Sequence, residues 1–307
     1  MQARTPDRQT GGMPTDLSAA VSFMAGHART LDRRRLELLL GSGDPGAVLA
    51  ALDAYRNPDG GYGWGLEPDL RAPESQPAGA LHAFEAIGDV APARTRRSLE
   101  LCDWLASVTL PDGGLGFALP VADDAALAPF WAQADPATSS LQITAYVAAA
   151  AHRVAASDPA VAEHAWLARA TRYCLNAAAA LGEAPHALVV NASLQLFDAV
   201  HDALPEAPAL LHRLGDLIPA DGRLGVAGGA EDESLRPLDF APLPDRPARA
   251  IFRPDVIARD LERMIGEQQQ DGGWRVDFAS YSPAAALEWR GYATVRAVTI
   301  LRRNSVI

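Results

Sequence analysis

The chain has 307 residues, of which 49% are hydrophobic, so it can bury a large core as one repeat-built domain or as two ordinary ones. Its formal net charge is −11, and its 27 basic residues are all arginines that alternate with acids along predicted helices, which argues against a nucleic-acid partner. No apolar run reaches 18 residues and the polar start of the chain does not resemble a signal peptide, so we expect a cytoplasmic protein without stable membrane insertion.

Helices are predicted along nearly the whole chain after a polar tail, residues 1–15, that we expect to be disordered. Asp16 or Ser18 can cap an opening helical hairpin that reaches Leu40. Amphipathic helices are then predicted at residues 45–55, 94–108, 160–181, 208–218 and 255–270. Ala-rich helices, apolar around most of their circumference, are predicted between them at residues 75–87, 138–154, 186–200 and 283–302. Five prolines between Arg236 and Pro254 predict a largely irregular segment there.

Asp-Gly turns recur at Asp59, Asp112, Asp221 and Asp271, which corresponds to a repeat of about 50 residues with one copy degraded near Gly182. Glycine in these turns permits a positive φ angle. The more polar helices belong on the outside and the Ala-rich helices on the inside. The sequence therefore predicts an all-α fold: an α/α toroid of two concentric helix layers, built from about five to six helical-hairpin repeats in a single domain, residues 16–307.

The clearest copy of the turn, Gln-x-x-Asp-Gly-Gly-Trp at residues 268–274, resembles the QW motif of squalene-hopene cyclases and oxidosqualene cyclases. The repeat layout is similar to that of the β-subunits of protein prenyltransferases, over most of residues 46–303. Motifs of this type bind outer helices to one another, because the amide satisfies backbone groups at a helix end and the aromatic ring packs over the turn. We therefore expect Gln268, Asp271, Gly272 and Trp274 to be structural.

The chain departs from these families where they carry their chemistry. The Asp-x-Asp-Asp motif of protonating cyclases is absent, and Asp123-Asp124 lacks the third carboxylate that ionising terpene synthases use to hold magnesium and diphosphate. Cys102 and Cys174 lie within helical patterns flanked by leucine, which favours two reduced, buried thiols over a disulfide or a metal site. We expect neither a metal nor another cofactor.

Candidate ligand-binding residues come from aligning the inner helices by repeat phase. This alignment places Gln76, Gln142, Asn191 and Arg290 at matching positions near the helix starts, which predicts a polar ring around a central cavity. Alternatively, each side chain satisfies its own neighbouring loop. Trp289 and Tyr292 add aromatic faces that could stabilise a carbocation, although such a cluster is also typical of a core.

Candidate catalytic residues are the acids in loops near this ring. Glu67 and Asp69 flank Pro68 in a loop that leads to an inner helix, and a carboxyl pair at an apolar mouth can have one pKa raised for general-acid work. Alternatively, the pair is solvated and tied to Arg71. Asp239 is an isolated acid among apolar residues in the long irregular segment.

Taken with the resemblance, these residues suggest a terpenoid-cyclase-like isomerase. It would fold an isoprenoid in a central apolar cavity and cyclise it by protonation from a loop carboxylic acid, with Asp69 first among the candidates. Two alternatives stay open: a non-catalytic toroid that binds a hydrophobic small molecule or a peptide, and a carbohydrate-active α/α barrel with paired carboxylates. Whether the centre of the toroid is a dry apolar cavity or an open polar groove is the observation that would best distinguish these interpretations.

Overall fold

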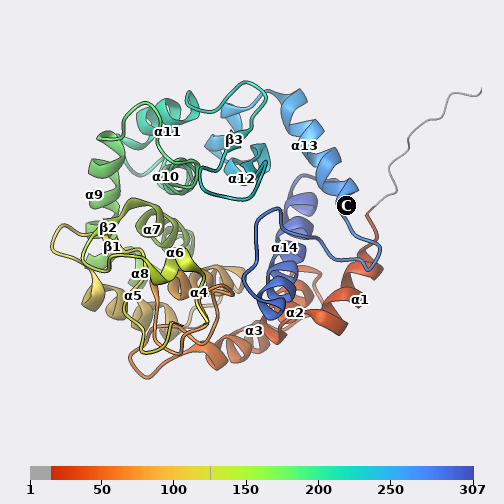
Figure 1. Ribbon diagram of the computed structural model, residues 1–307, viewed down its shortest axis with the longest axis horizontal. Coiled ribbons are helices and arrows are strands. Elements are labelled where there is room, and N and C mark those ends of the chain that lie inside the picture. Colours follow the sequence, from red (N-terminus) through yellow and green to blue (C-terminus); the bar gives the residue numbers. More distant parts are fainter. Residues whose placement is uncertain (1–14, 125) are drawn as a thin grey trace, which may run out of the picture.

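The computed structural model describes residues 15–124 and 126–307, and these residues are mostly helical, as Figure 1 shows. The expected all-α class is confirmed. The expected disordered tail lies outside the described residues except for its last residue. Within the described part of the chain, no helix combines the length and the apolar character needed to cross a membrane.

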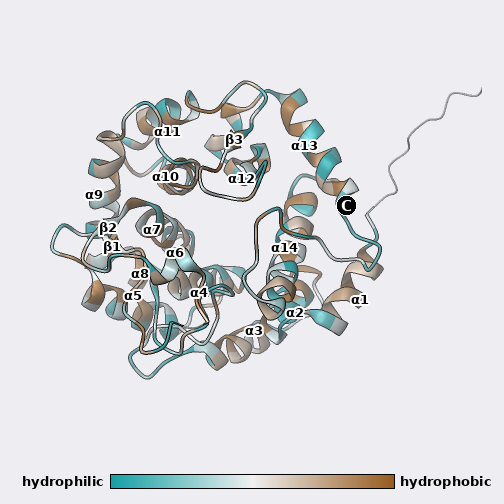
Figure 2. Cartoon of the chain, viewed as in Figure 1, coloured by the Kyte–Doolittle hydropathy of each residue, from teal (hydrophilic) through white to brown (hydrophobic). Residues whose placement is uncertain are grey.

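The helices lie in two layers around a common centre (Figure 1). Toward the outside lie α1 (Leu17–His27), α3 (Pro45–Leu52), α5 (Arg96–Val108), α9 (Ala165–Ala179), α11 (Ala207–Gly215) and α13 (Pro254–Gly266). Nearer the centre lie α4 (Pro77–Asp89), α7 (Leu141–Ala155), α10 (Ala187–Ala199) and α14 (Pro283–Arg303). These are the four helices that the sequence placed inside. The helix α2 (Thr30–Leu39) packs against α4 and α14. The outer helix α13 carries hydrophilic and hydrophobic bands, seen in Figure 2, because only one side of it packs inward.

Short elements fill the connections. They are the helices α6 (Pro129–Ala132), α8 (Pro159–Ala162) and α12 (Pro237–Phe240), and the 3-10 helices η1 (Asp53–Tyr55) and η2 (Pro247–Ile251). Two antiparallel strand pairs join β1 (Leu115–Gly116) to β2 (Ser139–Ser140) and β3 (Leu224–Gly225) to β4 (Ser234–Leu235). Residues 236–254, which were expected to be largely irregular, thus contain two short helices, α12 and η2. Buried apolar side chains from nearly all these elements form one cluster.

Local chemistry explains where the helices begin. The carboxylate of Asp16 accepts a hydrogen bond from the backbone N–H of Ala19, which confirms it as the cap of α1. Ser140 caps α7 and Ser282 caps α14 in the same way. Proline stands in the first turn of α3, α4, α13 and α14, where its missing N–H costs nothing.

Three of the Asp-Gly turns pack closely on another outer helix. Gly60, Gly113 and Gly272 all have positive φ angles. A Cβ atom at these glycines would stand 2.9, 3.0 and 2.1 Å from a backbone carbonyl oxygen of α5, α9 and α1, respectively. Only glycine allows both the conformation and the close approach. The turn after α13 therefore contacts the first helix, α1.

Gln268 strengthens this closing contact. Its side-chain oxygen accepts a hydrogen bond from the N–H of Asp16 at 2.8 Å, and its side-chain nitrogen donates to the carbonyl of Asp16 at 2.8 Å and to that of Gly272 at 2.9 Å. Trp274 is buried behind the turn and donates its indole N–H to Met264 in α13. The expected structural role of the motif is confirmed.

The two cysteines are free and buried, which confirms the expectation of reduced thiols. Burial raises the pKa of the Cys102 thiol to about 12, so it stays protonated and unreactive near neutral pH.

Alanine at position 272 tests the closing contact. The Gly272→Ala variant is expected to lose about 3 kcal/mol of unfolding free energy, because backbone strain at positive φ adds to the clash with α1. Gly41→Ala is the matched control, since Gly41 also has a positive φ angle but its Cβ would meet nothing within 4 Å; it is expected to lose about 1 kcal/mol. Urea denaturation of both variants measures the difference. Equal losses would show that the closing contact is loose.

Candidate functional site

Asp69 joins three segments of the chain. One of its carboxylate oxygens accepts a hydrogen bond from the indole N–H of Trp289 at 2.7 Å, and the other accepts from the backbone N–H of Tyr281 at 3.1 Å. Its carbonyl accepts from the N–H of Ala128 at 2.9 Å. We call the segments 64–71, 126–131 and 277–283 the loop cluster. Burial raises the pKa of Asp69, and the two hydrogen bonds to its carboxylate partly offset that effect.

The alternative of a solvated acid pair tied to Arg71 is wrong. Glu67 and Asp69 are both buried, and Arg71 forms its ion pair with Glu288 in α14 at 2.5 Å. Arg29, just before α2, holds the same loop by donating to the carbonyl of Leu66 at 2.9 Å.

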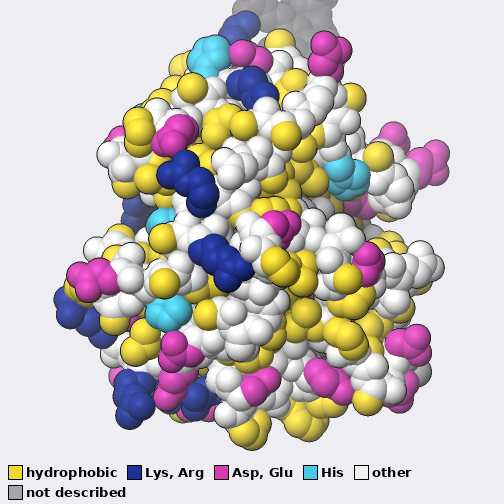
Figure 3. Space-filling view, turned by 90° about the vertical axis from the view of Figure 1, so that its left-hand side faces the viewer, with side chains coloured by type: hydrophobic (Ala, Val, Ile, Leu, Met, Phe, Trp, Pro, Cys, Tyr) yellow, Lys and Arg dark blue, Asp and Glu magenta, His cyan; other side chains and the backbone are white. Residues whose placement is uncertain are grey.

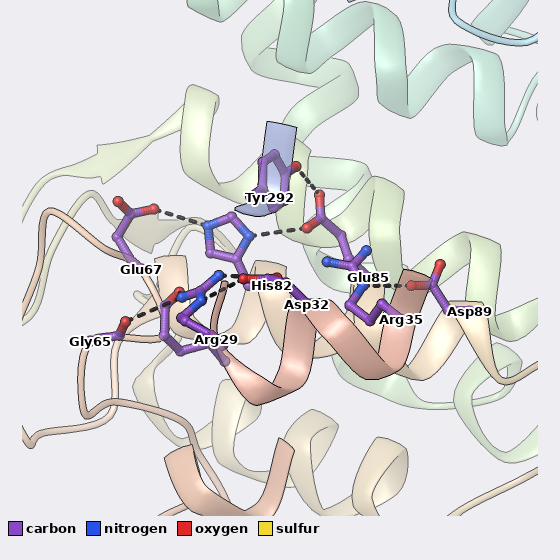
Figure 4. A network of polar contacts seen from close by, with 10 residues as sticks. Arg29, Asp32, Arg35, Gly65, Glu67, His82, Glu85, Asp89 and Tyr292 are labelled. Carbon is purple, nitrogen blue, oxygen red and sulfur yellow. Dashed lines mark hydrogen bonds and ion pairs between the residues drawn. The ribbon is translucent and has the colours of Figure 1, made fainter. Parts of the chain in front are cut away.

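His82 in α4 lies between two carboxylates (Figure 4). One ring nitrogen is 3.0 Å from a carboxylate oxygen of Glu67 and the other is 3.0 Å from one of Glu85, a turn further along α4. Tyr292 of α14 donates its hydroxyl hydrogen to the other oxygen of Glu85 at 3.0 Å. The four side chains thus form one hydrogen-bonded series that runs from the loop cluster toward the centre.

The ionisation of this series follows from its geometry. Burial alone would lower the pKa of His82, but the hydrogen bonds and charges of Glu67 and Glu85 raise it to about 9. Burial would raise the pKa of Glu85, yet the hydrogen bond and positive charge of His82, with help from Arg35, lower it to about 2. Near neutral pH His82 is therefore an imidazolium and Glu85 is a carboxylate. Burial raises the pKa of Tyr292, so its phenol stays protonated.

A layer of arginines from the start of the chain supports the series. Arg29 pairs with the buried Asp32 at 2.7 Å, and Arg35 pairs with Asp89 at 2.5 Å. The guanidinium of Arg35 also lies 5.9 Å from the centroid of the Tyr292 ring. The sequence indicated only an opening hairpin here and showed no role for α2 in the site.

Further polar groups from the other inner elements lie near Glu85 and Tyr292. We call this region the polar centre. Arg296 of α14 pairs with Asp239 of α12 at 2.9 Å, and Arg153 of α7 donates to the side chain of Gln195 in α10. The charge of Arg153 acts on Glu85 and Tyr292. The side chains of Arg296, Asp239 and Glu85 remain 36%, 24% and 20% exposed, so solvent reaches this centre although it lies deep in the fold.

The expected polar ring forms only in part. Asn191 of α10 is hydrogen-bonded to Tyr146 of α7, whose ionisation also responds to Asp239 and Glu85, so it belongs to the centre. Gln76 instead bonds both backbone groups of Leu119 at 3.1 and 2.8 Å, as the alternative interpretation anticipated.

Arg290 is also outside the ring, because it forms two hydrogen bonds with Asp271 and lies over the ring of Phe23 in α1. The alignment was wrong for Gln76 because its amide bonds the backbone of Leu119, and it was wrong for Arg290 because its guanidinium pairs with the carboxylate of Asp271. Gln142 is half-buried in the first turn of α7.

The sequence alignment missed the polar groups that do converge, because they lie one to three turns further along the inner helices than the aligned positions. They are His82, Glu85, Tyr146, Arg153, Gln195 and Arg296. A recognisable signal was present in the spacing of His82 and Glu85, three residues apart on an otherwise apolar helix, which places two ionisable groups on one buried face. Trp289 bonds the candidate acid Asp69, whereas Tyr292 bonds Glu85, and the centroids of the two rings are 5.6 Å apart.

Among the described residues, no group of three or more histidine, cysteine and acidic side chains has an arrangement that could hold a metal ion. No protein-family model matches the chain, and no curated protein matches it either.

The pH dependence of stability tests the charge state of His82. Because the pKa of His82 is raised in the folded protein, the protonated side chain stabilises the fold fully below the pKa of histidine in the unfolded chain, about 6.5. This stabilisation is lost as the pH rises toward 9. We expect the unfolding free energy of the wild type to fall by about 3 kcal/mol over this range. His82→Gln should be less stable at pH 6.5 and lack this fall, whereas substitution of the exposed His212 by Gln should keep it. Parallel pH profiles for the wild type and His82→Gln would contradict the assignment.

Proposed function

We propose that the two helix layers form an α/α toroid whose polar centre binds a hydroxyl-rich ligand of the carbohydrate class, on which the protein acts. This is one of the alternatives that the sequence left open. Its support is the mixture of donors and acceptors that α4, α7, α10, α12 and α14 present to one centre. A dry isoprenoid cavity lined by so many charged side chains would carry a large desolvation cost.

Glu85 is the observation that carries the proposal. It is held as a carboxylate by the imidazolium of His82 and the phenol of Tyr292, and its side chain still reaches solvent. An ionised carboxylate accepts hydrogen bonds from sugar hydroxyls. It can also stabilise the positive charge that develops at an anomeric carbon when a glycosidic bond is cleaved, a role that requires a low pKa.

The charges around Glu85 favour a neutral ligand. Arg153 and Arg296 supply donors, while Asp239 and Glu85 supply acceptors, so the signs nearly balance. Hydroxyl groups donate and accept at once and can satisfy both kinds of partner. A strongly anionic or cationic ligand would leave one set of charges unsatisfied in a partly desolvated site.

Titration calorimetry with glucose, N-acetylglucosamine and their hexasaccharides tests this function. The wild type is expected to bind at least one sugar, and Glu85→Gln is expected to weaken that binding about tenfold, because a charged acceptor is lost. Arg153→Gln should weaken it as well, whereas Glu37→Gln, which changes an exposed acid paired with Arg34, should not. Absence of sugar binding by the folded wild type would reject the proposal.

The isoprenoid cyclase implied by the resemblance is the second candidate, and a separate observation favours it. Burial raises the pKa of Asp69, and the carboxylate lies against the indole of Trp289. A buried acid beside an aromatic ring has the setting required to protonate an alkene and to stabilise the cation that follows.

Turnover of linear isoprenoids tests this second candidate. Under it, the wild type cyclises squalene or geranylgeranyl diphosphate, and turnover falls as pH rises above the raised pKa of Asp69, because only the protonated acid can donate. Asp69→Asn should reduce the rate at least about a hundredfold. Glu67→Gln and Asp239→Asn serve as comparisons for the other two candidate acids. Failure of the wild type to convert either substrate would exclude the cyclase.

A further inference from the structure

The chain between α10 and α14 lacks a second long inner helix. The helix α12 ends after four residues, whereas α10 and α14 have 13 and 21 residues. Four of the residues from 242 to 254 are prolines, which do not continue a helix because they lack the backbone N–H and clash with the preceding turn. The chain therefore passes through the short 3-10 helix η2 before α13 begins, and a cavity lies between η2 and α13.

This cavity has the size of a small-molecule site. Its volume is about 830 Å³, within the range of about 300–1,000 Å³ that is typical of ligand pockets. One part of its wall is apolar, because Phe252 and the α13 residues Ile257, Ala258 and Leu261 line it. None of its lining residues belongs to the polar centre, so the cavity is a separate place on the molecule.

Four charged residues line the cavity, and three of them have an ionisable partner. These three contacts join Asp245 to Arg303 at 2.9 Å, Arg246 to Asp198 at 3.1 Å, and Asp202 to His201 at 2.8 Å. The fourth charged residue is Arg249, which forms no ion pair with the described part of the chain. An arginine without a carboxylate partner in the wall of a cavity favours an anionic ligand there.

Neutral acceptors hold the side chain of Arg249 in place. Its Nε donates to the carbonyl of Leu243 at 3.3 Å, and its Nη2 donates to the carbonyl of Pro242 at 3.0 Å and to the side-chain oxygen of Asn304 at 2.9 Å. The remaining nitrogen, Nη1, has no hydrogen-bond partner among residues 15–124 and 126–307. Burial lowers the pKa of Arg249, and the charge of Asp245 offsets this effect only in part. The guanidinium is therefore a positioned cation whose charge is not neutralised.

We infer that this cavity binds a small amphipathic anion, an apolar body that carries one carboxylate, and that the carboxylate pairs with Arg249. The apolar body covers Phe252 and the adjacent side of α13, while a carboxylate oxygen accepts a hydrogen bond from Nη1. An uncharged ligand of the same shape leaves the cation unpaired, and a cationic ligand is repelled by it. The inference does not depend on the proposed function, because the polar centre contributes no residue to this cavity.

The helix α9, which lies away from α13 in Figure 1, supplies matched controls. Figure 3 shows the side of the molecule near α9 and α5, where charged side chains of both signs are interspersed with apolar ones. Ala168 is an exposed alanine within α9, as Ala258 is within α13. Arg172 of α9 is an exposed arginine that pairs with Glu206.

Calorimetry with octanoate, octanol and octylammonium tests the site, because these three compounds share a hydrocarbon chain and differ in charge. The wild type is expected to bind octanoate at least about tenfold more tightly than the other two. Arg249→Gln should remove this preference, since glutamine carries no charge. Ala258→Trp should weaken octanoate binding at least about tenfold, because the indole occupies the cavity and Arg249 is unchanged. Arg172→Gln and Ala168→Trp should leave the affinity unchanged.

Three outcomes would overturn the inference. The first is a folded wild type that does not bind octanoate, and the second is equal affinity for octanoate and octylammonium. The third is octanoate binding that survives Ala258→Trp but is lost in Glu85→Gln, which would place the anion in the polar centre. If thermal melting shows that Arg249→Gln is unfolded, the charge series on the wild type and the Ala258→Trp variant decide. Sugar binding enters none of these results, so they stand apart from the test of the proposed function.

Discussion

The turn at Gly272 packs so closely on α1 that a methyl group there would stand 2.1 Å from a carbonyl oxygen, and Gln268 bonds both backbone groups of Asp16, the cap of the same helix. This contact joins opposite ends of the chain and brings α14 beside α2. Gly291 allows the close approach, since its Cβ would stand 3.0 Å from Ala28. The centre depends on this closure, because Tyr292 reaches Glu85 only when the last helix lies beside the first ones.

Paired charges make it possible to place so many ionisable groups deep in the fold. An imidazolium alone would be costly at the position of His82, and so would either neighbouring carboxylate. His82 is hydrogen-bonded to both Glu67 and Glu85, and Arg35 and the phenol of Tyr292 lie near Glu85. The network keeps Glu85 ionised over a wide pH range, which suits a residue that binds or stabilises charge better than one that donates a proton.

Asp69 is central for a different reason. It accepts hydrogen bonds from Trp289 and Tyr281 and so connects the loop after α3 with α14 and the segment before it. Its burial gives it the raised pKa that the cyclase hypothesis requires. The same bonds make it the anchor of the loop cluster, so a structural role accounts for its position in either proposed function. Substrate turnover, rather than stability, distinguishes the two roles.

The sequence by itself determined the all-α class, the alternation of polar and apolar helices, the Asp-Gly turns and the structural role of the motif around Gln268, because these depend on local patterns of hydrophobicity, capping and glycine conformation. It also singled out Glu67, Asp69, Asp239, Trp289 and Tyr292, but not their partners. Only the tertiary structure decided that His82 lies between Glu67 and Glu85, that Arg290 pairs with Asp271, and that Arg35 of α2 lies beside Tyr292. Those contacts join residues far apart in the chain. The ionisation of these side chains depends on burial and on neighbouring charges, which a local sequence pattern does not predict.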